Sequence, residues 1–76
     1  MEINDFILHF AEQFDDLDEA QLSPETRFRD LDDWSSLIAL SVLAMIDEEY
    51  DIQLKVSEMR SANTIQELFD LINSKR

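Results

Sequence analysis

The sequence predicts a small all-α domain, a four-helix bundle with three main helices, one short helix and a long first loop. Three observations support this fold class. The 76 residues include no glycine and one proline, so few positions suit a tight left-handed turn. Apolar residues make up 45% of the chain and recur mostly at helical spacing. The length suits one domain, residues 1–76.

Charge and composition narrow the class of function. Eighteen acidic and six basic side chains give a net charge of −12 at pH 7. Such a surface does not favour binding to nucleic acid or to an anionic membrane, but it attracts basic partner proteins. The absence of cysteine and the single histidine, His9, argue against disulfides and against a zinc site. With no long apolar run and no signal-peptide pattern, we expect a soluble, cytoplasmic monomer.

The first helix is predicted from Ile3 to about Phe14, because apolar residues fall along one stripe there. Residues 15–19, four of which are acidic, then break the pattern. Ser23 and Pro24 are typical of a cap followed by the first position of a helical turn. Apolar residues recur through the polar stretch as far as Leu31. We therefore expect this loop to be long but ordered and packed against the core.

The strongest predicted helix runs from about Ser36 to Tyr50. Its apolar residues repeat at spacings of three and four, and further ones make it apolar nearly all round. Acidic residues gather at its end, where each opposes the helix dipole by roughly 0.3–1 kcal/mol. These acids are therefore expected to serve something other than helix stability: Asp47, Glu48, Glu49 and Asp51.

The C-terminal third predicts a short link and two further helical segments. Ile52 and Leu54 alternate with polar residues, as in an extended link, and one helical turn that carries Met59 is predicted from Ser57 to about Ser61. Thr64 and Glu67 have the spacing of a capping box, which opens the last helix. The inward residues of this helix are expected to be Ile65, Leu68, Phe69, Leu71 and Ile72.

Two adjacent serines, Ser35 and Ser36, stand directly before the apolar helix. Neither has a histidine or lysine beside it in the sequence to activate it as a nucleophile. The simpler interpretation is that Ser35 caps the helix through its hydroxyl. A functional interpretation is also open, because the start of a helix favours a bound or attached phosphate.

The order and spacing of these residues resemble the acyl carrier protein family. The family pattern is a leucine, a short polar turn, Asp-Ser-Leu, and an apolar helix that ends in acids and an aromatic residue. Here Leu31, the pair Ser36-Leu37 and residues 47–51 match it. Upstream, "LSPETRFRDL" looks like the loop of the family, and "TIQELFDLI" falls where its last helix begins. The resemblance covers essentially the whole chain.

The resemblance implies that Ser36 carries a 4′-phosphopantetheine arm, added from coenzyme A by a phosphopantetheinyl transferase. The thiol of the arm would hold acyl groups as thioesters for enzymes of fatty acid, polyketide or specialised lipid synthesis. The chain would be a carrier and not an enzyme. Two alternatives stay open: a carrier of an aminoacyl or D-alanyl group, and an unmodified helical adaptor with the same fold.

The resemblance also implies two sets of contact residues. Partner enzymes with basic docking patches are expected to contact the second helix at Leu37, Ile38, Ser41, Asp47 and Glu48. An acyl pocket is expected to open within the core, lined by Leu40, Leu43, Ile46, Leu54, Met59, Ala62 and Leu68.

The sequence departs from the family pattern around the serine. Ser35 replaces the usual aspartate, and Asp32-Asp33-Trp34 stands where a glycine is common. Ile38 and Ser41 occupy positions that are often acidic, so the front of the second helix is neutral and apolar. These differences bear on the choice of partner more than on the carrier function.

Overall fold

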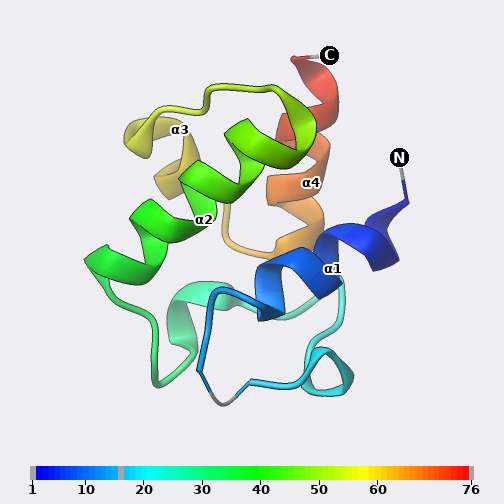
Figure 1. Cartoon of the computed structure of the whole chain (residues 1–76), viewed down its shortest axis with the longest axis vertical. Helices are drawn as coiled ribbons and strands as arrows, with labels where there is room; N and C mark the ends of the chain where they lie inside the picture. The colour runs from blue at the N-terminus through cyan, green and yellow to red at the C-terminus, as the bar shows by residue number, and fades with distance from the viewer. Residues whose placement is uncertain (1, 16, 76) are drawn as a thin grey trace.

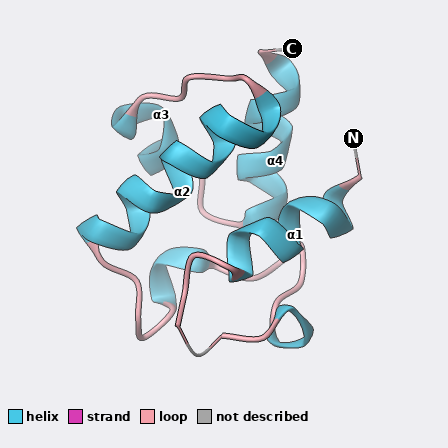
Figure 2. Cartoon of the chain, in the orientation of Figure 1, coloured by secondary structure: helices cyan, strands magenta, loops and turns pink. Residues whose placement is uncertain are grey.

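The computed structural model describes residues 2–15 and 17–75, and this part of the chain contains four α-helices (Figure 1, Figure 2). They are α1 (Ile3–Ala11), α2 (Ser36–Tyr50), α3 (Val56–Ser61) and α4 (Ile65–Ser74). Two short 3₁₀ helices, η1 (Glu19–Gln21) and η2 (Phe28–Asp30), lie between α1 and α2. Among the described residues, β pairing is limited to an isolated bridge between Arg27 and Thr64. The predicted all-α class is confirmed.

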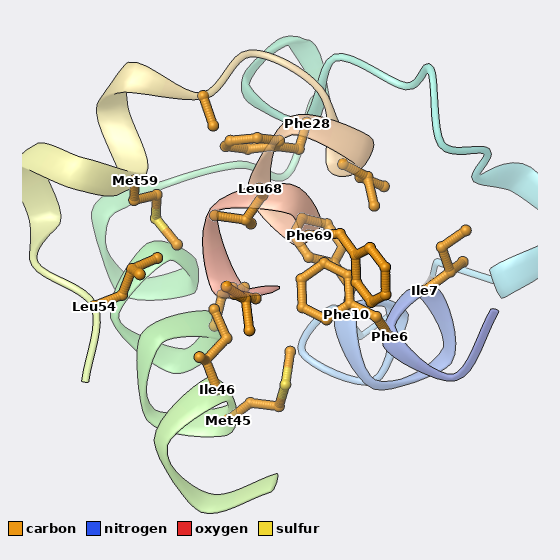
Figure 3. Packing of buried hydrophobic residues seen from close by; sticks show 14 of the residues in the cluster. Phe6, Ile7, Phe10, Phe28, Met45, Ile46, Leu54, Met59, Leu68 and Phe69 are labelled. Atoms are coloured by element: carbon orange, nitrogen blue, oxygen red, sulfur yellow. The ribbon is translucent and has the colours of Figure 1, made fainter. Parts of the chain in front are cut away.

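The core lies where α1, α2 and α4 meet (Figure 3). Phe6 and Phe10 from α1, Ile46 from α2 and Leu68 from α4 are fully excluded from solvent. The ring centroid of Phe6 lies 5.7 Å from that of Phe69 and 6.2 Å from that of Phe10. No polar or charged residue is buried in the described part of the chain. The helices are therefore held together mainly by apolar burial.

Helix α1 ends at Ala11, earlier than the predicted end near Phe14. The amides of Gln13 and Phe14 donate to the carbonyls of Phe10 and Ala11, both at 3.1 Å. These bonds span three residues instead of four, so the chain tightens into turns. Phe14 is nevertheless buried, at 6% exposure. The apolar spacing predicted its burial correctly and its helical conformation wrongly.

Helix α2 has the predicted bounds, but the leucines that carry its periodicity are not the buried ones. Leu37 is 73% exposed and Leu40 is 57% exposed. The buried face consists of Val42, Met45 and Ile46. A helix that is apolar nearly all round has no polar face to mark its outside, so tertiary contacts choose the buried side. Two large leucines consequently stay at the surface near the start of α2.

The described part of the long segment between α1 and α2 packs against the core and the start of α4, as predicted. The first amides of α4 have no partner within that helix. Those of Ile65 and Gln66 donate to the carbonyls of Thr26 and Pro24, at 3.1 and 2.8 Å. Phe28 of the same segment is fully buried. The loop thus caps α4 with its backbone while anchoring a side chain in the core.

Helices α3 and α4 are fixed by local and cross-helix contacts. Helix α3 begins at Val56, one residue before the predicted turn. The predicted capping box of α4 is confirmed: Thr64 Oγ1 accepts from the amide of Glu67 (3.1 Å), and Glu67 Oε1 accepts from the amide of Thr64 (2.9 Å). Lys75 Nζ lies 2.6 Å from Glu58 Oε2, which ties the end of α4 to α3. None of the described helices combines the length and apolarity needed to span a membrane.

We expect acid unfolding to depend on the capping carboxylate of Glu67. The backbone amides of Asn63 and Thr64 donate to this carboxylate and lower the pKa of Glu67 in the folded state. The resulting stabilisation is complete above the unfolded pKa, about 4.3, and is lost as the pH falls through the lowered folded value. Glu67→Gln keeps an acceptor oxygen but no charge, so its melting temperature falls less steeply below about pH 4.3.

Thermal melts followed by circular dichroism across the acid range measure this effect. Asp70→Asn is the matched control, because Asp70 is an exposed acid of the same helix whose one hydrogen bond within residues 2–15 and 17–75 comes from the Gln66 side chain. It is expected to keep the steep acid limb of the wild type. Superimposable acid limbs for wild type and Glu67→Gln would contradict the assignment.

Candidate functional site

A cavity of about 500 Å³ opens at the N-terminal end of α2. Figure 1 shows that the start of α2 and helix α3 lie on the same side of the bundle. Met59, which is 2% exposed, is the most deeply buried lining residue. Two serines and two arginines contribute polar groups to walls that are otherwise mostly apolar. The lining residues are Arg29, Trp34, Ser35, Ser36, Ala39, Leu40, Val56, Met59 and Arg60.

Trp34 anchors the loop from which α2 starts. Its ring centroid lies 5.0 Å from that of Phe28, 6.2 Å from that of Phe10 and 6.4 Å from that of Phe14. The planes of Trp34 and Phe10 differ by 5°, as in a stacked pair. Aromatic pairs stabilise by about 0.5–1.5 kcal/mol each beyond the burial of their area. Because Trp34 directly precedes the two serines, this cluster fixes where they lie.

The two serines have different local roles. Ser35 has an extended backbone, and its Oγ accepts from the amide of Ile38 at 3.2 Å. It is therefore the N-cap of α2, as predicted. Ser36 is the first helical residue, is exposed, and its hydroxyl makes no side-chain hydrogen bond with the described residues. One hydroxyl is occupied by capping, and the other is available at the cavity.

The cavity does not hold a general base for Ser36. His9, the single histidine of the sequence, lies on α1 and not among the lining residues. Its Nδ1 is 3.4 Å from Glu12 Oε1, and its Nε2 is 3.9 Å from Glu49 Oε1. Its ring centroid lies 6.0 Å from that of Tyr50, whose pKa is raised mainly by burial. His9 thus packs near the far end of α2, away from Ser36.

Of the seven residues predicted to line an acyl pocket, two line the observed cavity and five do not. Leu40 and Met59 line the cavity beside Ser36. Leu43 is partly buried against the core. The remaining four lie in the core and do not line this cavity: Ile46, Leu54, Ala62 and Leu68.

The residues predicted to contact partners also differ in exposure. Leu37 is 73% exposed, and Asp47 and Glu48 are exposed near the other end of α2. Ile38 and Ser41 are half-buried. The accessible part of this face is therefore an apolar start and an acidic end.

Sequence reasoning did not place Arg29, Val56 and Arg60 at the site. Arg29 comes from η2 and its Nη2 donates to Asn63 Oδ1, while Arg60 comes from α3. Their meeting with Ser36 depends on how the segments pack. The one feature of the sequence that could have indicated this role is that Arg29 and Arg60 are basic residues in a strongly acidic chain.

Comparison with known proteins identifies a protein family that matches this chain. The profile of the family described as the phosphopantetheine attachment site matches residues 5–72. The chain is similar to "Polyketide-8 synthase acyl carrier protein 2" from Streptomyces avermitilis, with 32% identity over 60 residues. This alignment covers 79% of the chain and 69% of the relative. No solved structure gives a significant match.

We expect the two serines to respond differently to removal of the hydroxyl. Ser35→Ala removes the N-cap acceptor of Ile38 and is expected to cost about 0.5–2 kcal/mol of unfolding free energy. Ser36→Ala removes an exposed hydroxyl without a described partner, so its effect is expected within about 0.5 kcal/mol of zero. Urea unfolding of the two unmodified variants measures the difference. A larger loss for Ser36→Ala than for Ser35→Ala would reverse the assignment of the cap.

Proposed function

The chain belongs to the phosphopantetheine-binding acyl carrier protein family, and from this we propose that Ser36 carries the 4′-phosphopantetheine arm. Members of this family are carriers and not catalysts. The observation that supports Ser36 is its free, exposed hydroxyl at the cavity, next to a Ser35 hydroxyl that is occupied as a cap. Ser36 is also followed by Leu37, as in the Ser-Leu pair of the family pattern.

The residues around Ser36 suit such an arm. The cavity falls within the range of small-molecule sites, about 300–1,000 Å³. Its apolar residues, Trp34, Leu40 and Val56 among them, can contact the aliphatic parts of the arm. The thiol of the bound arm supplies the thioester chemistry. The role of the chain is to hold the arm at the start of α2 and to present it.

Attachment of the arm needs an external enzyme, because the cavity holds no base for the serine hydroxyl. In the proposed step, Ser36 Oγ forms the new bond to the phosphorus of coenzyme A that bears the pantetheine. The 3′,5′-bisphosphoadenosine group leaves, and the serine proton passes to a base of the phosphopantetheinyl transferase. The uncovered position of Ser36 on the first turn of α2 supports access by that enzyme.

We further propose that the carried acyl groups are intermediates of a polyketide-type synthase, since the similar carrier protein bears that name. Fatty acid or specialised lipid synthesis uses the same arm chemistry and is the next candidate. The single domain, residues 1–76, is proposed to act as a cytoplasmic monomer, in line with its net charge of −12.

The partner surface is proposed to run along α2 from Leu37 to Glu48. Leu37 and Leu40 offer exposed apolar contacts beside Ser36. Asp47 and Glu48 offer charge to basic patches, which mainly raises the rate of encounter. The acyl chain is proposed to enter beside Leu40 and Met59, and deeper entry would require Ile46 and Leu68 to move apart.

The attachment site is tested by intact mass. After incubation with coenzyme A and a broad-specificity phosphopantetheinyl transferase, we expect wild type and Ser35→Ala to gain one arm and Ser36→Ala to gain none. Peptide mass spectrometry then locates the arm. An arm on Ser35, or unmodified wild type, would refute the assignment.

The partner surface is tested by the kinetics of the same transfer. We expect Leu37→Glu to lower kcat/KM about tenfold, because it places a charge where an apolar contact forms on docking. Leu8→Glu is the matched control, since Leu8 is an exposed leucine (41%) on α1.

Glu48→Lys tests the acidic end of the same surface. It is expected to slow association at low salt and to approach the wild-type rate at high salt, because ions screen exposed charges. Equal kcat/KM for wild type, Leu37→Glu and Glu48→Lys would place docking on another face.

A further inference from the structure

Two of the six basic residues of the chain line the cavity that holds Ser36. Arg29 reaches it from η2 and Arg60 from α3. These segments are far apart in the sequence, and the fold brings them to one site. In a chain with a net charge of −12, this is a local concentration of positive charge.

Neither arginine is committed to a carboxylate in the described part of the chain. The close contacts between basic and acidic side chains found there join His9 to Glu12 and Glu49, and Lys75 to Glu58. Arg29 donates to the neutral side chain of Asn63, which orients its guanidinium and leaves further N–H groups available. Two arginine residues therefore line the cavity, and neither has a carboxylate partner among the described residues.

Two arginines at one cavity are best suited to bind an anion. Guanidinium matches phosphate and carboxylate oxygens with paired, charge-assisted hydrogen bonds. A phosphodiester on Ser36 is covalently attached to a residue that lines the cavity. The phosphate therefore stays at the cavity, whichever way the rest of the arm runs. A carboxylate on the cargo lies at the far end of the arm and has no such fixed place. The phosphate is thus the anion that the geometry favours.

We propose that Arg29 and Arg60 bind the phosphodiester of the arm on Ser36 and hold the arm against the apolar wall of the cavity. This inference rests on the proposed attachment at Ser36. The two arginines offset the negative charge that the phosphate adds beside the acidic turn residues Asp32 and Asp33. Both are exposed residues, so the contact is modest in strength and weakens as salt rises.

The arm phosphate can be observed directly by ³¹P NMR of the modified protein. For wild type we expect a broad phosphodiester line that narrows with added salt, as the arm leaves the arginines. For Arg29→Gln/Arg60→Gln we expect a narrow line at all salt concentrations. In this double variant the ratio of docked to free arm is expected to fall about fivefold, which corresponds to the free energy of two partly exposed charge pairs.

The matched control is Arg27→Gln. Arg27 belongs to the same loop as Arg29, and its loss changes the net charge by one unit, as each of the two cavity substitutions does, but it does not line the cavity. It is expected to leave the ³¹P line unchanged. Arg29→Lys/Arg60→Lys keeps the charge without the paired geometry, so an intermediate line width is expected.

A second readout uses the absence of cysteine from the chain. A thiol-reactive fluorophore then labels the arm alone, and its anisotropy reports how firmly the arm is held. We expect the anisotropy to drop in Arg29→Gln/Arg60→Gln and to stay unchanged in Arg27→Gln. Circular dichroism of each variant verifies that the fold is intact.

The outcomes separate this inference from the proposed function. If Ser36 carries the arm but Arg29→Gln/Arg60→Gln has the wild-type line width and anisotropy, the inference is overturned and the carrier function stands. A difference that arises only when the cargo bears a carboxylate also overturns it, in favour of a cargo contact. If intact mass shows no arm on Ser36, both fail together.

Discussion

The packing of Trp34 against Phe10, Phe14 and Phe28 is the contact on which the rest of the site depends. It joins α1, the turn after it and η2 to the residue that precedes the two serines. Holding each residue of the loop before α2 in one conformation costs roughly 1–2 kcal/mol of backbone entropy. Without the Trp34 contacts, few interactions would offset that cost. The aromatic cluster offsets that cost and places Ser36 at the cavity.

The same loop also holds the start of α4. Its carbonyls at Pro24 and Thr26 accept from the first amides of α4, while the side chain of Phe28 enters the core. A segment without long helices therefore links α1, α2 and α4. This explains how a domain with no disulfide and a small apolar core holds a long loop in place.

Charge is divided along the proposed functional face. The end of α2 is acidic, its start is apolar, and the cavity beside Ser36 carries two arginines. The acids oppose the helix dipole and repel one another, so they cost stability where they stand. We propose that these acids speed the encounter with basic partners, and that the exposed Leu37 and Leu40 provide the apolar contact that holds a docked partner.

The sequence by itself determined the features that depend on neighbouring residues. The bounds of α2, the cap at Ser35 and the capping box of Thr64 and Glu67 follow from contacts three residues apart, which a short sequence pattern contains. The family also followed from sequence, because the order of the loop, the Ser-Leu pair and the acidic helix end is itself a sequence property.

Tertiary structure alone decided the features that need distant segments to meet. It chose Val42, Met45 and Ile46 as the buried face of α2, because a helix that is apolar nearly all round carries no pattern to mark its inner side. It likewise brought Arg29 and Arg60 to one cavity with Ser36. No local spacing encodes that meeting, since it results from the packing of η2 and α3 around the start of α2.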